Sequence, residues 1–218
     1  MAVLGSGSAA ASVDHGTPPV GPGTAIRVGD QRCTLGFVFT GSDGVAVGLT
    51  AAHCGEVGAA VSTIDHQSLG TVVARDYDGH GRDIDLVRLA SPTVPITSDY
   101  PHNGRYWPVL GVMGIADAMT SGAEVCTYGA ISGESCGEVT GSADAERTVY
   151  GRNTITKGDS GGPMVVIGTA GVYALATVSG YLTNDPTLAV GRVIEPYMTT
   201  WALTSSGRTS TGSVAGAA

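Results

Sequence analysis

Three short stretches of the chain carry side chains that can take part in covalent catalysis. A histidine stands in TAAHC (His53), an aspartate heads DIDLVRL (Asp83), and a serine stands in KGDSGGP (Ser160). Each stretch has an unreactive interpretation when it is taken alone: a buried histidine beside a disulfide, a solvated acidic turn and a glycine-rich turn. Together, in this order, they supply a general base, a residue that orients the base, and a nucleophile. We therefore predict that these three residues form a catalytic triad.

The serine turn can also bind a developing negative charge. Glycines let the backbone adopt conformations that direct two N–H groups at one point. The amides of Gly158 and Ser160 are the natural pair for an oxyanion site. GDSGG also satisfies the GxSxG pattern of the α/β-hydrolases. In that fold the acidic residue follows the serine and the histidine comes last, so the order in this chain excludes it.

Length and composition indicate an all-β protein. A chain of 218 residues is long enough for one large β domain or two small ones. It has 34 glycines, is rich in Thr and Val and contains few stretches of helix formers, which favours strands. The net charge is −8 and no cluster of Lys and Arg occurs, which disfavours a nucleic-acid partner.

Strand-like runs recur in two sets, separated by a proline-bounded segment at 92–108. The first set comprises 36–39, 45–49, 70–74 and 83–89; the second comprises 109–113, 124–127, 137–140, 148–150, 164–167, 172–178 and 188–193. Two sets of short strands suggest two small barrels. We predict a flexible leader (1–24), an N-terminal barrel (25–95), a C-terminal barrel with a short helix at 195–203 (96–203) and a flexible tail (204–218).

Two segments bear on membranes and export. Residues 161–184 carry no charge, but they contain five glycines and their apolar residues come in short runs. Two buried strands with a tight connection fit this segment better than one membrane-spanning helix. Ala9, Ala10 and Ala11 fit the small-residue rule for signal-peptide cleavage, so the leader is interpreted either as a signal or pro-segment remnant or as a flexible leader without a function.

The four cysteines, Cys33, Cys54, Cys126 and Cys136, form one pair in each half of the chain. Four cysteines allow three pairings, of which the two local ones are the simplest. A zinc site is the alternative, but there is no CxxC motif and no pair of histidines at ligand spacing. Disulfides are favoured, which implies an oxidising compartment, and no metal or cofactor is expected.

The three motifs, in this order, resemble the chymotrypsin-like serine proteases. QRCTLGF, LTAAHC and VCTYGAISGESCG narrow the resemblance to the secreted actinobacterial streptogrisins, over residues 26–201. The resemblance implies two perpendicular six-stranded antiparallel barrels with the triad in the cleft between them. It also implies the disulfides Cys33–Cys54 and Cys126–Cys136.

The chain departs from these relatives at two places. They usually carry an arginine where Thr127 stands, and it pairs with the aspartate before the nucleophile. Asp159 lacks that partner, and a buried unpaired carboxylate is costly. Arg32, Arg152, Lys157 or a newly cleaved N-terminal amine are the candidate substitutes. The segment between Tyr150 and Gly158 is also shorter and lacks a third disulfide.

The resemblance implies that the floor of the substrate pocket lies near Thr154, a few residues before the nucleophile. The opposite wall is predicted at Thr177, Val178, Ser179 and Gly180, whose backbone can pair with an extended substrate. No Asp or Glu occurs from Val149 to Lys157, so the pocket has no partner for a basic side chain. We expect cleavage after small or medium apolar residues. Lys157 is either a solvated loop residue or a contact for an acidic group at the rim.

The sequence therefore predicts a secreted or cell-envelope serine endopeptidase that acts on peptide or protein substrates as a monomer. The alternative is a catalytically silent relative that serves as a binding module. The intact triad favours the enzyme, whereas Thr127 and the short pocket segment favour the silent module.

Overall fold

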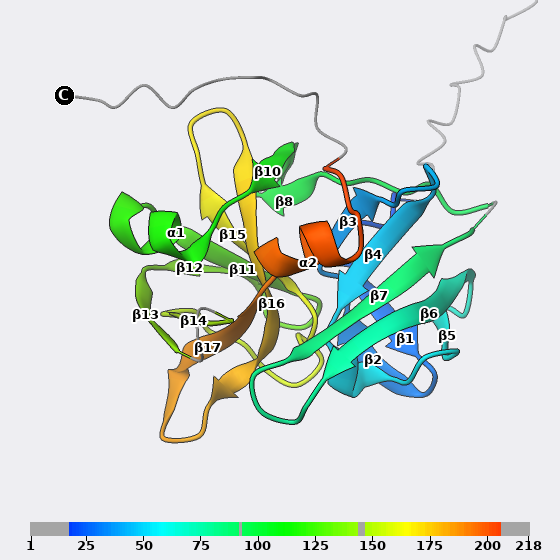
Figure 1. Ribbon diagram of the computed structural model, residues 1–218, viewed down its shortest axis with the longest axis horizontal. Coiled ribbons are helices and arrows are strands. Elements are labelled where there is room, and N and C mark those ends of the chain that lie inside the picture. The colour runs from blue at the N-terminus through cyan, green and yellow to red at the C-terminus, as the bar shows by residue number, and fades with distance from the viewer. Residues whose placement is uncertain (1–17, 92, 144–146, 206–218) are drawn as a thin grey trace, which may run out of the picture.

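The computed structural model describes residues 18–91, 93–143 and 147–205. Antiparallel strands form two curled sheets that lie side by side, and the helices are few and short, which confirms the predicted all-β fold class (Figure 1). The predicted leader and tail fall largely outside the described residues. The prediction of a flexible leader is corrected for residues 18–24, because Val20 is 4% exposed and forms a β-bridge with Ile96. The buried side chain holds this part of the chain against the first barrel.

The first sheet contains seven strands in the order β2-β1-β5-β6-β7-β4-β3. Their bounds are β1 (Ala25–Val28), β2 (Gln31–Thr34), β3 (Phe37–Thr40), β4 (Ala46–Thr50), β5 (Ala60–Thr63), β6 (Ser68–Tyr77) and β7 (Asp83–Leu89). Strand β7 lies between β6 and β4, and all but one of its residues are buried. A central strand buried on both faces explains why DIDLVRL is apolar at most positions.

The second sheet contains eight strands, seven of them in the order β12-β11-β15-β16-β17-β14-β13, with β10 parallel to β16. Their bounds are β10 (Val109–Val112), β11 (Val125–Gly129), β12 (Gly133–Gly137), β13 (Val139–Ala143), β14 (Thr148–Gly151), β15 (Pro163–Ile167), β16 (Val172–Leu182) and β17 (Asp185–Val193). Strands β15 and β16 pair directly, which confirms that the uncharged segment 161–184 forms two strands.

The number of strands in each sheet exceeds the six expected, for a simple geometric reason. Strands β2 and β3 are interrupted only at Leu35 and Gly36, and β12 and β13 only at Glu138. A strand that turns the corner of a barrel bends there and loses its ladder hydrogen bonds for a residue or two. If each pair is counted as one bent strand, both barrels have six, with β10 as an addition to the second. The boundary at 95/96 stays a prediction, and the sheets lie on either side of it.

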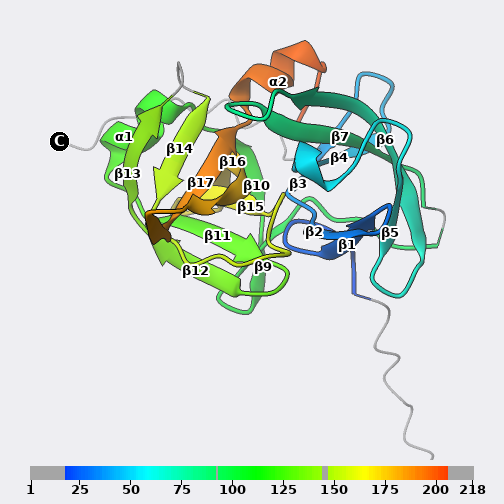
Figure 2. The same ribbon diagram turned by 90° about the horizontal axis from the view of Figure 1, so that it is seen from below.

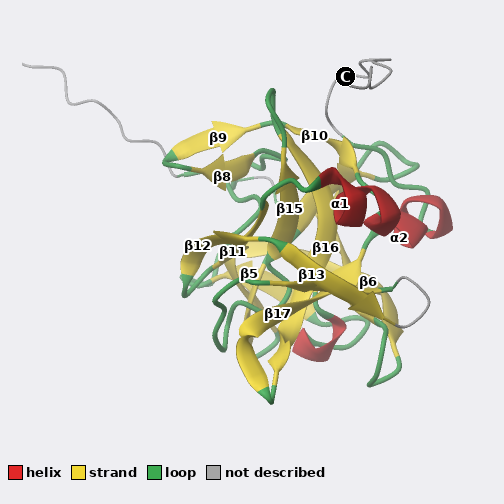
Figure 3. Ribbon diagram, turned by 90° about the vertical axis from the view of Figure 1, so that its left-hand side faces the viewer, coloured by secondary structure: helices red, strands yellow, loops and turns green. Residues whose placement is uncertain are grey.

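The remaining elements lie around the barrels. They are the hairpin β8 (Tyr100–His102) and β9 (Arg105–Trp107), helix α1 (Ile115–Ser121), helix α2 (Glu195–Thr200) and a 3-10 turn (Ala52–Cys54). Helix α2 confirms the short C-terminal helix, whereas α1 and the hairpin were not predicted (Figure 3). Among the described residues, neither α-helix is long and apolar enough to cross a membrane.

Each barrel has its own apolar core, and a third cluster joins the two. The joining cluster combines Phe37, Leu49 and Ile84 of the first sheet with Val165 and Ile194 from the second half of the chain. All five side chains are buried, so the barrels are packed against each other rather than tethered (Figure 2). The line along which they meet brings together the histidine, aspartate and serine stretches.

Candidate active site

His53 lies in the turn that follows strand β4. The 3-10 turn Ala52–Cys54 holds it, and a disulfide joins Cys54 to Cys33 on β2. The side chains on either side of the histidine are buried, whereas the His53 side chain is 36% exposed. The disulfide was implied by the resemblance and is present. The turn therefore presents the imidazole at the surface between two fixed neighbours.

Asp83, the first residue of β7, contacts His53 at two points. Its Oδ2 lies 2.7 Å from the imidazole Nδ1, and its Oδ1 accepts a hydrogen bond of 2.8 Å from the His53 backbone N–H. The hydroxyl of Ser179 donates a third hydrogen bond, of 2.5 Å, to Oδ2. Three contacts fix the carboxylate, and the carboxylate in turn fixes the orientation of the imidazole.

Opposing effects act on the pKa of Asp83. Burial works to raise the pKa, because a charged carboxylate loses its hydration in the interior. The hydrogen bond from His53, the charge of His53 and the hydroxyl of Ser179 lower it, and together they outweigh burial. The pKa therefore lies below the ordinary value for aspartate, and Asp83 is ionised at neutral pH.

The turn that carries Ser160 uses its backbone N–H groups selectively. The Asp159 N–H donates to Thr156 O at 3.1 Å, the Gly161 N–H to Val178 O at 2.6 Å and the Gly162 N–H to Asp159 O at 2.9 Å. In the part of the chain that the structure describes, the N–H groups of Gly158 and Ser160 donate to no protein acceptor. The two amides predicted for an oxyanion site are thus the two that are free to bind a ligand.

The serine turn packs directly against the segment that precedes His53. A Cβ atom on Gly161 would lie 2.1 Å from Thr50 Oγ1 and 2.7 Å from the Ala51 nitrogen. Gly161 also has a φ of +85°, which favours glycine. Within the described residues, hydrogen bonds join His53 to Asp83 but not to Ser160. Contacts between nucleophile and base are often long in the absence of substrate.

Asp159 is fully buried, and its partners differ from those considered for it above. Its Oδ1 accepts hydrogen bonds from the N–H groups of Ile131 at 2.9 Å and Ser132 at 3.2 Å. Its Oδ2 accepts one from the Thr156 N–H at 2.7 Å. None of the proposed arginine or lysine substitutes is needed, because three backbone N–H groups satisfy the carboxylate. Its Cγ lies 2.1 Å from where a Cβ on Gly129 would be, so only glycine fits there.

The residues predicted to line the substrate pocket do not all face solvent. Thr177 and Val178 are 0% and 1% exposed, so their side chains lie in the barrel core, and this part of the prediction is wrong. The backbone N–H of Val178 donates to Gly162 O, and its C=O accepts from the Gly161 N–H, so both groups are bonded to the serine turn. The Ser179 hydroxyl points to Asp83, and Thr154 is exposed and donates its N–H to Ser135 Oγ at 2.8 Å. Gly180, half-buried, continues the strand.

Two cavities adjoin residues of this group. One of about 290 Å³ adjoins the histidine and aspartate, and its lining residues are His53, Tyr77, Gly79, His80, Arg82, Asp83, Ser179 and Arg192. Another of about 350 Å³ adjoins the free amide of Gly158, and its lining residues are Asp30, Gln31, Arg32, Ile131, Lys157 and Gly158. The two cavities share no lining residue.

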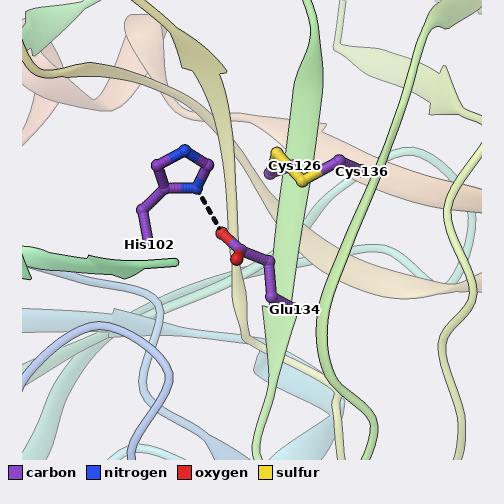
Figure 4. A group of neighbouring side chains, drawn as sticks. All are labelled: His102, Cys126, Glu134 and Cys136. Atoms are coloured by element: carbon purple, nitrogen blue, oxygen red, sulfur yellow. Dashed lines mark hydrogen bonds and ion pairs between the residues drawn. A yellow bond between two sulfur atoms is a disulfide. The ribbon is translucent and has the colours of Figure 1, made fainter. Parts of the chain in front are cut away.

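A second imidazole–carboxylate pair lies in the other barrel. The Nδ1 of His102 is 2.6 Å from Glu134 Oε1, beside the disulfide Cys126–Cys136 (Figure 4). All four residues offer metal-ligand atoms within 4.8 Å of one another. The two sulfur atoms are bonded to each other, however, which leaves one imidazole and one carboxylate. This pair ties the β8–β9 hairpin to strand β12.

Sequence reasoning missed two functions in this region. Ser179 was assigned to the substrate wall, and its bond to Asp83 has no signal in the sequence. Thr34, which is fully buried and contacts the serine turn at several points, was not considered at all. The sequence around Thr34 gives no sign of this role, because its partner Gly158 lies more than a hundred residues away along the chain.

Two packed β-barrels with a histidine, an aspartate and a serine turn at their junction define the chymotrypsin-like fold of serine proteases. The protease of Nocardiopsis is similar in structure, with a TM-score of 0.66, 26% identity, and coverage of 86% of this chain and 99% of that one. Protease A of Thermobifida fusca has a TM-score of 0.69 and 24% identity over 86% of this chain and 98% of its own.

The sequence is 31% identical over 173 residues to streptogrisin-A of Streptomyces griseus, covering 75% of this chain and 52% of that protein. The chain thus spans about half the length of this relative. No family model matches the chain. The chain is a homologue of streptogrisin-A with the fold of the actinobacterial chymotrypsin-like proteases, and the resemblance predicted from the motifs is confirmed.

Proposed function

We propose that the protein is a serine endopeptidase in which Ser160 is the nucleophile, His53 the general base and acid, and Asp83 the residue that orients His53. The observation that carries the proposal is the fixed imidazole–carboxylate pair, together with the two unused N–H groups of the serine turn. A base held in one orientation and a preorganised anion site are the two parts that acyl transfer requires.

In the first half of the reaction, Ser160 Oγ forms a bond to the carbonyl carbon of the substrate while its proton passes to His53 Nε2. The carbonyl oxygen becomes an oxyanion and accepts hydrogen bonds from the N–H groups of Gly158 and Ser160. His53 then gives the proton to the amide nitrogen, the C–N bond breaks, and the amine product leaves an acyl-enzyme. Ionised Asp83 stabilises the imidazolium that exists between these two steps.

In the second half, water takes the place of the amine. His53 accepts a proton from water as its oxygen attacks the acyl carbon, and the same two amides bind the second oxyanion. The proton then returns to Ser160 Oγ as the ester bond breaks and the carboxylic acid leaves. The hydrogen bond from Ser179 to Asp83 keeps the carboxylate in one position throughout.

Two separate cavities, one beside His53 and Asp83 and one beside Gly158, support cleavage within a peptide chain rather than at its end. Substrate preference rests on the absence of Asp and Glu from Val149 to Lys157, which leaves a basic side chain unpaired. We propose cleavage after small or medium apolar residues, with Thr154 and Gly180 beside the side chain. Arg32 and Lys157 line the cavity on the leaving-group side and suit an acidic substrate group there.

We propose that the protein acts as a monomer on peptide or protein substrates, outside the cell or in the cell envelope, and without a nucleic-acid partner. Two disulfides support an oxidising compartment. The acidic net charge of −8 argues against phosphate binding.

The test is reaction with a fluorophosphonate, followed by peptide mapping of the labelled residue. We expect a single label on Ser160, its loss in Ser160→Ala, and peptidase activity on a mixed peptide library in parallel. A silent binding module gives no label although the protein is folded. The backbone amides around Asp159 remove one of the two reasons for that alternative, because the carboxylate has partners.

A further inference from the structure

Thr34, at the end of strand β2, makes four hydrogen bonds although it is fully buried. Its N–H donates to Ser160 O at 2.8 Å, and its hydroxyl donates to Gly158 O at 2.8 Å. The hydroxyl also accepts from the Ala130 N–H at 3.1 Å, and the Thr34 carbonyl accepts from Thr50 Oγ1 at 2.9 Å. One residue of the first barrel thus contacts both the serine turn and the turn between β11 and β12.

The two carbonyls that Thr34 holds lie on either side of one proposed oxyanion donor, the Ser160 N–H, and the Gly158 carbonyl belongs to the same residue as the other. The Ser160 N–H belongs to the peptide group between Asp159 and Ser160. The Gly158 carbonyl precedes that peptide, and the Ser160 carbonyl follows it. When both carbonyls are fixed, the peptide between them has little freedom to rotate, and its N–H keeps its direction.

The serine turn contains a glycine, Gly158, whose conformation must be held in place by its neighbours. Gly158 has a φ of +98°, and a glycine can leave that conformation at low cost. A change in the Gly158 torsions that turned its carbonyl away would break the bond to Thr34 and would shift the adjoining peptides, which carry the two free N–H groups. The hydroxyl of Thr34 opposes this change, because the Gly158 carbonyl would lose the only hydrogen-bond donor that it has among the described residues. The Ala130 contact ties the same hydroxyl to the turn whose neighbouring amides bind Asp159.

We propose that Thr34 is a positioning residue for the oxyanion site and, together with the backbone amides around Asp159, takes the place of the ion pair that the resemblance implies for this aspartate. The role rests on the proposed function, since it concerns the geometry of that same site. It also implies that the site is formed without a newly cleaved N-terminal amine.

The test compares Thr34→Val, Thr34→Ser and the control Thr63→Val. Valine keeps the shape and the backbone N–H but removes the hydroxyl, whereas serine keeps the hydroxyl. Thr63 is also buried, and its hydroxyl accepts from the Gln67 N–H at 3.0 Å within the first barrel. The measurements are kcat, KM, thermal stability and the affinity of a peptide aldehyde, whose adduct with the serine carries an oxyanion.

For Thr34→Val we expect kcat and aldehyde affinity to fall together, by on the order of 10- to 100-fold, with KM within about twofold. Thr34→Ser should retain most of both, and Thr63→Val should leave both unchanged while it lowers thermal stability. If Thr34→Val only loses stability, as the control does, and keeps its kcat and aldehyde affinity, the positioning role is refuted.

Failure of the proposed function has a different signature, because wild-type protein would then neither cleave peptides nor react with the fluorophosphonate. The crystal structure of Thr34→Val decides the inference in that case. A Gly158 carbonyl turned away from residue 34, together with a redirected N–H group of Gly158 or Ser160, supports the role of Thr34, and an unchanged serine turn overturns it.

Discussion

Asp85 is a buried carboxylate for which the structure gives a quantitative prediction. It is 0% exposed, and neither of its oxygens has a hydrogen-bond partner among the described residues. Burial, the main cause, raises its pKa from 3.8 to about 8, the charge of Arg75 opposes the shift, and the charges of Asp83 and Glu56 add to it. Asp85 is therefore protonated in the folded protein at neutral pH.

The sign of the effect on stability follows from linkage. Below about pH 4 the carboxyl is protonated in both the folded and the unfolded chain, so it causes no pH dependence there. Between about pH 4 and pH 8 the unfolded chain loses the proton and the folded chain keeps it, so the free energy of unfolding falls by ~1.4 kcal/mol per pH unit. Above about pH 8 the loss is complete, at on the order of 5 kcal/mol.

The substitution Asp85→Asn keeps the shape and removes this titration. Urea unfolding with intact disulfides, followed by the fluorescence of Trp107 and Trp201, measures the free energy of unfolding of both proteins from pH 5 to pH 8. We expect the variant to gain about 4 kcal/mol relative to wild type over that range. Asp43→Asn, at an exposed aspartate whose pKa is lowered by Arg88, should show no such gain.

Parallel curves for wild type and Asp85→Asn would refute the reasoning. They would mean that Asp85 is ionised in the folded protein through an ion pair with Arg75. Arg75 lies directly opposite Asp85 on strand β6, so this alternative has a specific geometry.

Three further predictions concern the site and its supports. Asp83→Asn should lower kcat by on the order of 10⁴, because an amide holds the wrong tautomer of His53, and circular dichroism should show that the fold is kept. Gly161→Ala should cost more than about 2 kcal/mol in urea unfolding, because the new Cβ meets Thr50 and Ala51 at a positive φ; a smaller loss would contradict the close packing of the two turns. A peptide-library digest should show cleavage after apolar residues, and dominant cleavage after Arg or Lys would reveal a carboxylate elsewhere in the pocket.

The sequence by itself determined the elements whose signals are local. The runs at 45–49, 83–89, 164–167 and 172–178 became β4, β7, β15 and β16, because each is a run of apolar residues bounded by turn residues. Strands β1, β2 and β5, at one end of the first sheet, were missed, since each has only four residues and includes polar or charged side chains that blur the pattern. No strand was assigned to the hairpin β8–β9, because its three-residue strands are too short to show a period.

The motifs also determined the types and order of the residues proposed for the triad, because that proposal depends on chemistry that each side chain carries with it. Only the tertiary structure decided how those residues are held. Ser179 reaches Asp83 across 96 positions, Thr34 reaches Gly158 across 124, and Asp159 takes its partners from backbone amides that every residue type except proline supplies. Contacts of this kind depend on where the barrels place the backbone, so they cannot be predicted from the residue types along the chain.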